Sequence, residues 1–179
     1  MSDTYQHFAN DYDWLFDDEG MRHGVAIQSP ATARVLSELT PGSTVLDAAC
    51  GTGIDAVALE RRGFRVHASD GSPAMVEQAV ARFRQEGAEV HGFVATWDQL
   101  PDSTRRRFDA VLCIGNSLVH ATGPEAMVSA LRGLRAVARS GGRVVIDSRN
   151  WEKLHRDRQI VSVYDRPIAR GGRRCVVVY

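Results

Sequence analysis

Short apolar runs alternate with amphipathic stretches along the chain from about residue 43 onward. Five short runs rich in β-forming residues predict strands at residues 44–47, 64–68, 89–94, 108–114 and 143–147. Longer stretches with apolar residues three or four positions apart predict helices at residues 54–62, 73–86 and 124–140. Strands that alternate with helices form βαβ units, so the sequence predicts an α/β fold with a doubly wound, mostly parallel sheet.

Local signals mark where two of these helices begin and end. Ser72 and Pro73 are typical of an N-cap and a first helical turn, and Gly87 is typical of a helix end. The last helix opens at Pro124 and ends before the Gly141–Gly142 pair. Its expected buried stripe consists of Met127, Leu131, Leu134 and Val137. Because such sheets bind ligands at the carboxyl ends of their strands, functional residues are expected there.

Residues 1–42 do not share this alternation. Their first half is rich in aromatic and acidic residues, and a helix is expected at about residues 30–39. We interpret this segment as a helical lid or packing arm in front of the core at residues 43–152. A chain of 179 residues has the length of one domain and is too short for two full α/β domains.

Composition and charge exclude several classes of protein. The 22 Lys and Arg residues balance the 22 Asp and Glu residues, whereas a nucleic-acid binder usually shows a basic excess. No apolar run approaches the roughly 20 residues of a membrane-spanning helix, so no membrane partner is expected. Cys50, Cys113 and Cys175 lack the spacing of a zinc site or a CxxC pair, which favours free thiols, no metal and a cytoplasmic location.

The strongest local signal follows the first predicted strand. Asp47 ends that strand, and Gly51 and Gly53 allow the backbone to approach a ligand where the next helix begins. Asp70 follows the second strand, where a carboxylate can accept hydrogen bonds from both hydroxyls of a ribose. Together these residues predict a ligand that contains a nucleoside.

Two nucleoside cofactors, NAD and S-adenosylmethionine, differ in the charge that they would bring to this loop. The segment 51–56 matches a loose dinucleotide fingerprint, but the pyrophosphate of NAD would face the like charge of Asp47. The ammonium and sulfonium groups of S-adenosylmethionine would be attracted to the same carboxylate. Structural interpretations stay open at three positions: a strand-end cap at Asp47, a turn residue at Asp70, and a core residue rather than an adenine contact at Met75.

The order D-x-x-x-G-x-G, with an acid after the second strand, is the pattern of class I methyltransferases, and this chain resembles one. Three further segments narrow the resemblance: Ala95–Asp98, Phe108–His120 with the order G-N-S-x-x-H, and Val145–Trp151 with the order D-x-R-N. These segments are similar to the glycine N-methyltransferases and glycine/sarcosine N-methyltransferases of betaine synthesis. The resemblance extends from about Tyr5 to about Tyr164. The resemblance implies a Rossmann-like sheet at residues 43–152 that binds S-adenosylmethionine and releases S-adenosylhomocysteine.

The resemblance also assigns residues to the cofactor and to the substrate. The implied cofactor-binding residues are Tyr5, Asp47, Ala49, Gly51, Gly53, Asp70, Gly71, Met75, Thr96, Trp97, Ile114 and Gly115. The implied substrate-binding residues are Asn116, His120, Arg149 and Tyr164. Asp70 would hold the ribose, with Thr96 and Trp97 beside the adenine. Asn116 and Arg149 would bind a substrate carboxylate. No catalytic acid or base is assigned, because in-line methyl transfer depends mainly on positioning.

Structural interpretations remain open on the substrate side as well. Arg149 presents a fork that suits a carboxylate, but it could instead form a salt bridge with Asp147 or Asp13. Asn116 could be a turn residue, and His120 could be a structural histidine. Tyr5, on the cofactor side, could contribute ordinary packing.

The resulting hypothesis is an S-adenosylmethionine-dependent N-methyltransferase that acts on a small amino acid such as glycine or sarcosine. Two competing hypotheses are a methyltransferase for another small molecule and a noncatalytic cofactor-binding subunit. The noncatalytic subunit is considered because residues 153–179 would only begin the substrate-side strands. Two alternatives stay open: the sequence is truncated, or the sheet lacks the family's last C-terminal strands. We expect a small-molecule partner, and an exposed sheet edge could also pair in a homo-oligomer.

Overall fold

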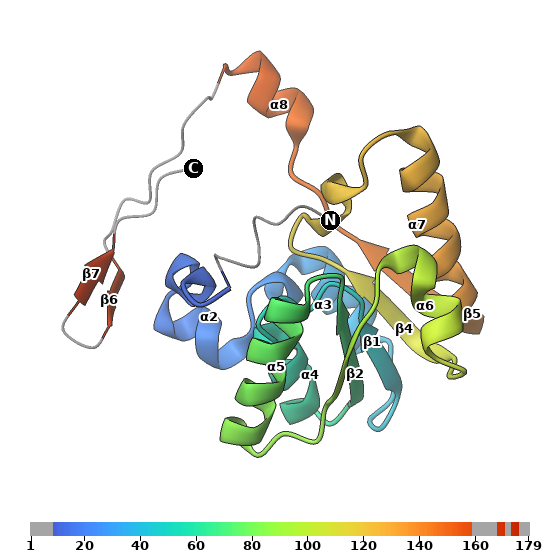
Figure 1. The fold of residues 1–179 in the computed structure, drawn as a ribbon, viewed down its shortest axis with the longest axis horizontal. Coiled ribbons are helices and arrows are strands. Elements are labelled where there is room, and N and C mark those ends of the chain that lie inside the picture. Colours follow the sequence, from blue (N-terminus) through green and yellow to red (C-terminus); the bar gives the residue numbers. More distant parts are fainter. Residues whose placement is uncertain (1–8, 159–167, 171–172, 176–179) are drawn as a thin grey trace.

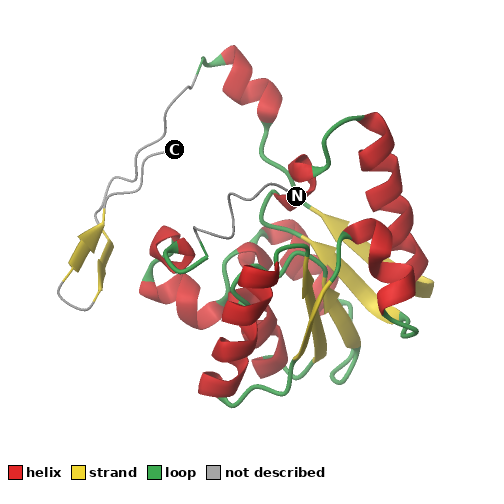
Figure 2. Cartoon of the chain, viewed as in Figure 1, coloured by secondary structure: helices red, strands yellow, loops and turns green. Residues whose placement is uncertain are grey.

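The computed structural model of the chain describes residues 9–158, 168–170 and 173–175. In this part of the chain a five-stranded sheet has the order β3 (His91–Val94), β2 (Arg65–Asp70), β1 (Thr44–Asp47), β4 (Phe108–Cys113) and β5 (Ala138–Ile146). All neighbouring strands of this sheet are parallel. Helices lie on both faces of the sheet (Figures 1 and 2). The predicted doubly wound α/β fold is therefore confirmed.

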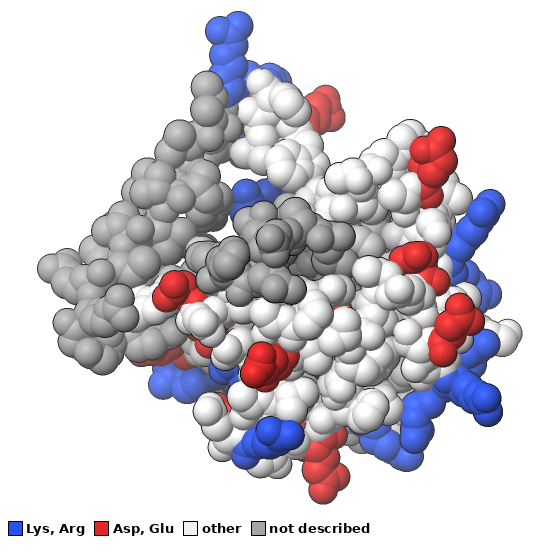
Figure 3. All heavy atoms as spheres, viewed as in Figure 1, with Lys and Arg blue, Asp and Glu red and all other residues white. Residues whose placement is uncertain are grey.

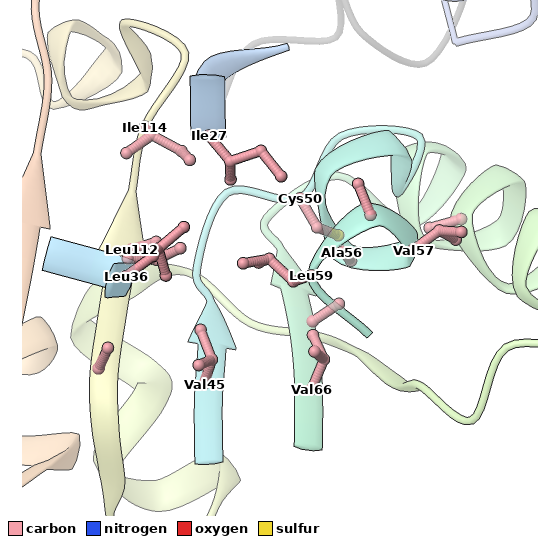
Figure 4. Close-up of a cluster of buried hydrophobic side chains, with 14 of the residues drawn as sticks. Ile27, Leu36, Val45, Cys50, Ala56, Val57, Leu59, Val66, Leu112 and Ile114 are labelled. Atoms are coloured by element: carbon pink, nitrogen blue, oxygen red, sulfur yellow. The ribbon is translucent and has the colours of Figure 1, made fainter. Parts of the chain in front are cut away.

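One face of the sheet is covered by α3 (Pro30–Ser37), α4 (Ile54–Arg61) and α5 (Pro73–Glu86). Figure 4 shows the apolar cluster on this side, which includes Ile27, Leu36, Val45, Leu59, Val66 and Leu112. Full burial of one such side chain stabilises the fold by about 1.5–3 kcal/mol. Because β1 alternates its side chains, Val45 joins this cluster, whereas the next residue joins the cluster on the other face.

The other face is covered by η3 (Trp97–Gln99), α6 (Leu100–Ser103) and α7 (Pro124–Val137). The predicted buried stripe of α7 is wrong in part, because Leu131 is 39% exposed while Gly133 is buried. A Cβ on Gly133 would lie 1.9 Å from the carbonyl oxygen of Trp97. The close approach of η3 to α7 thus selects a small residue, which an apolar stripe does not reveal.

The boundary between α7 and β5 also differs from the prediction. The helix ends at Val137 and β5 begins directly at Ala138, rather than after the Gly141–Gly142 pair. Ala138 pairs with Phe108, and regular pairing resumes only where Arg143 meets β4, so the strand contains an irregularity. Gly141 lies within it at a φ angle of 72°. The glycines therefore belong to a break inside the strand and not to a helix end.

The remaining elements lie in the chain before α3 and after β4. Those before α3 are η1 (Tyr12–Leu15), α2 (Asp18–His23) and η2 (Ala26–Gln28). The Asp55 carboxylate of α4 accepts hydrogen bonds from the amides of Val25 and Ala26 at 2.6 Å and 3.1 Å, which ties this segment to the core. Those after β4 are η4 (Ser117–His120), α8 (Trp151–Arg156) and the antiparallel pair β6 (Ile168–Arg170) and β7 (Arg173–Cys175).

Figure 3 shows acidic and basic side chains interspersed over the visible face of the molecule. This mixture agrees with the zero formal net charge of the chain. Among the described residues, none of the helices has the length and the apolar composition needed to cross a membrane.

Candidate functional site

The loop that joins β1 to α4 turns sharply at the carboxyl end of β1. Gly51 and Gly53 have φ angles of 52° and 84°, in the left-handed region that favours glycine. A Cβ on Gly53 would lie 2.6 Å from Cε1 of Phe83 on α5, so a side chain has no room there. The Cys50 amide donates a hydrogen bond to the Ser69 carbonyl at 3.0 Å. The loop is thus held against β2 and α5, with its backbone close to the carboxyl edge of the sheet.

Asp70 ends β2 and holds two loops together. Its Oδ2 accepts a hydrogen bond from the Gly51 amide at 3.0 Å, and its Oδ1 accepts one from the Ser72 amide at 2.9 Å. Burial raises the pKa of Asp70, and the amide hydrogen bonds and the nearby charge of His120 offset part of that rise. Each carboxylate oxygen has a further lone pair, so Asp70 can also accept hydrogen bonds from ligand hydroxyls.

Asp47 at the end of β1 is a buried carboxylate that is 2% exposed. Its Oδ1 accepts a hydrogen bond from the Ala49 amide at 3.4 Å. Burial, together with the like charges of Asp55 and Asp70, raises the pKa of Asp47 well above its ordinary value. Three carboxylates close to one another favour a cationic ligand here and disfavour an anionic one.

Trp97 and Met75 supply the apolar part of the site. Trp97 is 8% exposed, and its Nε1 donates a hydrogen bond to the Ala48 carbonyl at 2.8 Å, which fixes the ring against the loop after β1. Met75 lies in the first turn of α5 and is 2% exposed. Thr96 is the N-cap of η3, and its amide donates to Oε1 of Gln99 at 3.1 Å. Its hydroxyl and amide therefore serve the cap of a short helix.

The loop after β4 is held by a carboxylate from the end of β5. Oδ2 of Asp147 accepts from the Gly115 amide at 3.0 Å, and Oδ1 accepts from the Asn116 amide at 2.6 Å. Both loop residues have positive φ angles, 77° and 61°. Oδ1 of Asn116 accepts from the Arg149 amide at 3.1 Å. The two predicted carboxylate-binding residues are therefore adjacent, and the Arg149 side chain is exposed.

These loops enclose a cleft with about 520 Å³ of empty space, part of which is open to solvent. It lies at the carboxyl ends of β1, β2 and β4, where α/β sheets bind their ligands. The lining residues are Tyr12, Ala48, Ala49, Gly51, Asp70, Gly71, Met75, Trp97, Gly115, Ser117 and His120.

Half of the residues expected from the sequence line this cleft. They are Ala49, Gly51, Asp70, Gly71, Met75, Trp97, Gly115 and His120. The other described members of the set lie in the adjoining strands and loops: Asp47, Gly53, Thr96, Ile114, Asn116 and Arg149. Ile114, for example, is 3% exposed and belongs to the apolar core. Tyr5 and Tyr164 lie outside the described residues. The individual roles of all these residues stay predictions.

Sequence reasoning missed Tyr12, Ala48 and Ser117 as lining residues. Ala48 lies inside the glycine loop and could have been included on position alone. Ser117 turns its hydroxyl back to the Ile114 carbonyl, to which it donates at 2.7 Å. Tyr12 belongs to the aromatic and acidic N-terminal segment, whose fold against the loop depends on tertiary contacts. No local pattern in the sequence distinguishes it from the neighbouring aromatic residues.

The site fits S-adenosylmethionine better than a dinucleotide. Asp70 retains acceptor capacity for ribose hydroxyls, and Trp97 and Met75 provide apolar surface for a base. The buried carboxylate of Asp47 and the partly buried carboxylate of Asp70 suit a ligand that carries an ammonium and a sulfonium group. The same carboxylates would repel a pyrophosphate.

Solved structures support the same fold. A structure of an S-adenosylmethionine-dependent methyltransferase from Clostridium acetobutylicum matches 99% of this chain and 80% of that chain, with a TM-score of 0.67 and 20% identity. An amino pentose methyltransferase from Micromonospora echinaspora, solved with S-adenosylmethionine bound, matches 97% of this chain and 62% of that chain, with a TM-score of 0.64 and 20% identity. At these identities the likeness establishes the fold alone.

Curated relatives and a family comparison give closer matches. The glycine/sarcosine N-methyltransferase of Parasynechococcus marenigrum is 35% identical over 111 residues, and the human glycine N-methyltransferase is 35% identical over 123 residues. Each match covers 62% of this chain but 39% and 42% of the relatives, so the chain spans about two fifths of their length. The model of a family described as a methyltransferase domain matches residues 45–142. That match covers more than half of the chain, which therefore belongs to this methyltransferase domain family.

Proposed function

We propose that the chain binds S-adenosylmethionine in the cleft and methylates the amine of a small amino acid such as glycine or sarcosine. The observation that carries the proposal is a pair of carboxylates, the buried Asp47 and the partly buried Asp70, which accept hydrogen bonds from amides of the loop after β1. Asp70 would accept hydrogen bonds from the ribose, and Asp47 would face the cationic part of the cofactor. When bound, the cofactor supplies a methyl group activated by a positively charged sulfur.

The substrate class is inferred from Asn116 and Arg149 and from the relatives whose names include glycine or sarcosine. The hydrogen bond from the Arg149 amide to the Asn116 carboxamide supports a shared task for the two residues. The Arg149 guanidinium would bind a carboxylate through two hydrogen bonds, and the Asn116 Nδ2 would add a donor. Holding the substrate carboxylate leaves its amine free to face the methyl group. The cytoplasmic location and a homo-oligomer stay predictions.

The experiment is a screen of small amines with S-adenosylmethionine that carries a labelled methyl group. Glycine, sarcosine and dimethylglycine would be compared with amines of the same size that lack a carboxylate, such as ethanolamine. Label should be transferred to the amino acids and not to the amines without a carboxylate. Transfer to ethanolamine at an equal rate would contradict the carboxylate-binding role. If the chain binds S-adenosylmethionine but methylates none of these compounds, the proposed substrate class is wrong.

A further inference from the structure

The N-terminal segment is joined to the candidate cofactor site through a polar cluster that the proposed function does not use. Oδ1 of Asp13 accepts a hydrogen bond from the hydroxyl of Thr52 at 2.7 Å, and Oδ2 forms an ion pair with the Arg82 guanidinium. Nε of Arg82 also donates to the Thr52 carbonyl at 2.8 Å. Residues from η1, the glycine loop and α5 thus form a closed ring of contacts, which we call the Asp13 cluster.

The burial of the Asp13 cluster separates it from ordinary surface ion pairs. Thr52 is 2% exposed, and the side chains of Arg82 and Asp13 are 15% and 30% exposed. By contrast, the ion pair between Arg34 and Glu38 has side chains that are 84% and 48% exposed. Hydrogen bonds that involve charged groups are stronger than neutral ones, and partial burial reduces their screening by salt. The cluster can therefore hold η1 in one position on the loop.

Tyr12 precedes Asp13 in the same short helix, and its side chain lines the cleft. Its Cε1 lies 3.5 Å from the place that a Cβ on Gly51 would occupy, so the ring covers the glycine loop directly. The ring of Phe16 packs edge-on against it, with the centroids 5.4 Å apart. Because Tyr12 and Asp13 are consecutive in one helical turn, the contacts of the Asp13 carboxylate restrain the backbone that carries the Tyr12 ring.

We propose that Asp13 and Arg82 are positioning residues that hold Tyr12 as a wall of the cofactor site, so that release of the Asp13 cluster opens the cleft. The inference rests on the proposed function only in naming the ligand. The cluster itself is a feature of the chain without ligand. A cluster that merely stapled the N-terminal segment to the core would change the stability of the fold but not the affinity for a ligand.

The first test uses the chain without ligand. Asp13→Asn keeps the shape of the side chain but removes the charge that pairs with Arg82. Asp11→Asn is the matched control, since Asp11 is exposed and caps η1 without a side-chain hydrogen bond. Amide hydrogen exchange should increase at least fivefold in residues 11–16 of Asp13→Asn, and stay unchanged in β4 and in the control. Unchanged exchange in residues 11–16 would show that the cluster does not hold this segment.

The second test measures affinity for S-adenosylhomocysteine by calorimetry, because this ligand lacks the sulfonium charge and reduces long-range electrostatic effects. Asp13→Asn should weaken binding about tenfold, because the ligand then has to order the η1 segment that one charge-assisted hydrogen bond holds in place in the unchanged chain. Tyr12→Ala should weaken binding similarly, and the double variant should be little weaker than either single variant. Equal affinities of Asp13→Asn and the unchanged chain would overturn the inference, as would additive losses in the double variant.

Arg82→Lys tests the geometry of the cluster. A lysine ammonium keeps the charge but lacks the fork that reaches both Asp13 and the Thr52 carbonyl. We expect Arg82→Lys to weaken binding by about half as much as Asp13→Asn does, on a logarithmic scale. Arg84→Lys changes an exposed position on the same helix and should bind normally. Failure of the unchanged chain to bind any S-adenosylhomocysteine would contradict the proposed function and this ligand assignment. The exchange experiment would still decide whether the cluster holds Tyr12.

Discussion

At the scale of single residues, Asp47 is a buried carboxylate with two further carboxylates, Asp55 and Asp70, close enough to affect its charge. Its raised pKa means that, between the ordinary aspartate pKa and the higher pKa of the folded state, the folded chain keeps a proton that the unfolded chain has already released. Stability therefore falls as the pH rises from the ordinary aspartate pKa through the higher pKa of the folded state, and stays lower above it. A residue that destabilises the fold in this way is typical of a ligand site.

We expect Asp47→Asn to raise the free energy of unfolding at neutral pH, because it removes the buried charge without changing the shape of the side chain. The same substitution should weaken binding of S-adenosylmethionine about tenfold or more, since a charged acceptor is lost. Urea unfolding at several pH values and calorimetry would measure the two effects. Asp102→Asn, at an exposed position, is the control for net charge. Identical stability of the variant and the unchanged chain at every pH would contradict the interpretation of Asp47.

A substitution of Arg149 distinguishes substrate binding from cofactor binding. Arg149→Lys should leave the affinity for S-adenosylmethionine unchanged and lower kcat/KM for the amino acid about tenfold to a hundredfold, since an ammonium cannot form the paired hydrogen bonds of a guanidinium. Arg156→Lys, on the exposed surface of α8, is the matched control. Normal substrate kinetics in Arg149→Lys would remove the carboxylate-binding role.

At the scale of elements, the contact between α7 and η3 depends on the absence of a side chain. Gly133→Ala would improve helix propensity by about 1 kcal/mol at an exposed position. Here the new Cβ would meet the Trp97 carbonyl at 1.9 Å, so η3 has to move away from α7. We expect a net loss of stability of about 1–3 kcal/mol, as for other overpacked sites.

Trp97 also donates to the loop after β1, so a displaced η3 should disturb the cofactor site as well. Urea unfolding would measure the stability of Gly133→Ala, and calorimetry its affinity for S-adenosylhomocysteine. Ser129→Ala, on the exposed side of α7, is the control and should be neutral or slightly stabilising. A stabilised Gly133→Ala would mean that η3 and α7 are not in close contact.

The order of strands and helices could be predicted from the sequence because the signals are local. Ser72 and Pro73 form the N-terminus of α5 as predicted, and Gly87 ends that helix at a φ angle of 64°. The strand β1 ends at Asp47 as predicted, whereas β2 continues to Asp70 rather than ending at residue 68, so that Asp70 lies at the end of the strand and not after it. Local propensity and fold agree at these places, as expected for a foldable sequence.

The features that could not be predicted depend on residues far apart in the chain. Gly133 is buried because η3 lies against it, and no pattern within α7 records that neighbour. Tyr12 lines the cleft because the Asp13 cluster connects η1 to the glycine loop and to α5. Such placements are set by tertiary contacts, which override local hydrophobic periodicity.

At the scale of the whole molecule, the zero net charge of the chain conceals a local separation of charge. Acidic and basic side chains are mixed on the surface (Figure 3), whereas the buried carboxylate of Asp47 and the partly buried carboxylate of Asp70 lie at one end of the sheet. A parallel sheet brings these two strand ends together, since β1 and β2 are neighbours. The fold thus concentrates negative charge at the cleft without giving the protein a long-range field.

This separation of charge predicts which ligands stabilise the folded chain. At about 100 times its dissociation constant, S-adenosylmethionine should raise the free energy of unfolding by about 2.7 kcal/mol. For a chain of this size that corresponds to an increase in Tm of roughly 5–10 °C. NAD at the same concentration should produce no comparable increase, because the carboxylates of Asp47 and Asp70 repel its pyrophosphate. Asp70→Asn should greatly reduce the increase with S-adenosylmethionine, since ribose hydroxyls lose a charged acceptor. Scanning fluorimetry of the unchanged chain and of Asp70→Asn would measure the increase in Tm with each ligand. An equal increase with NAD would contradict the electrostatic basis of the site.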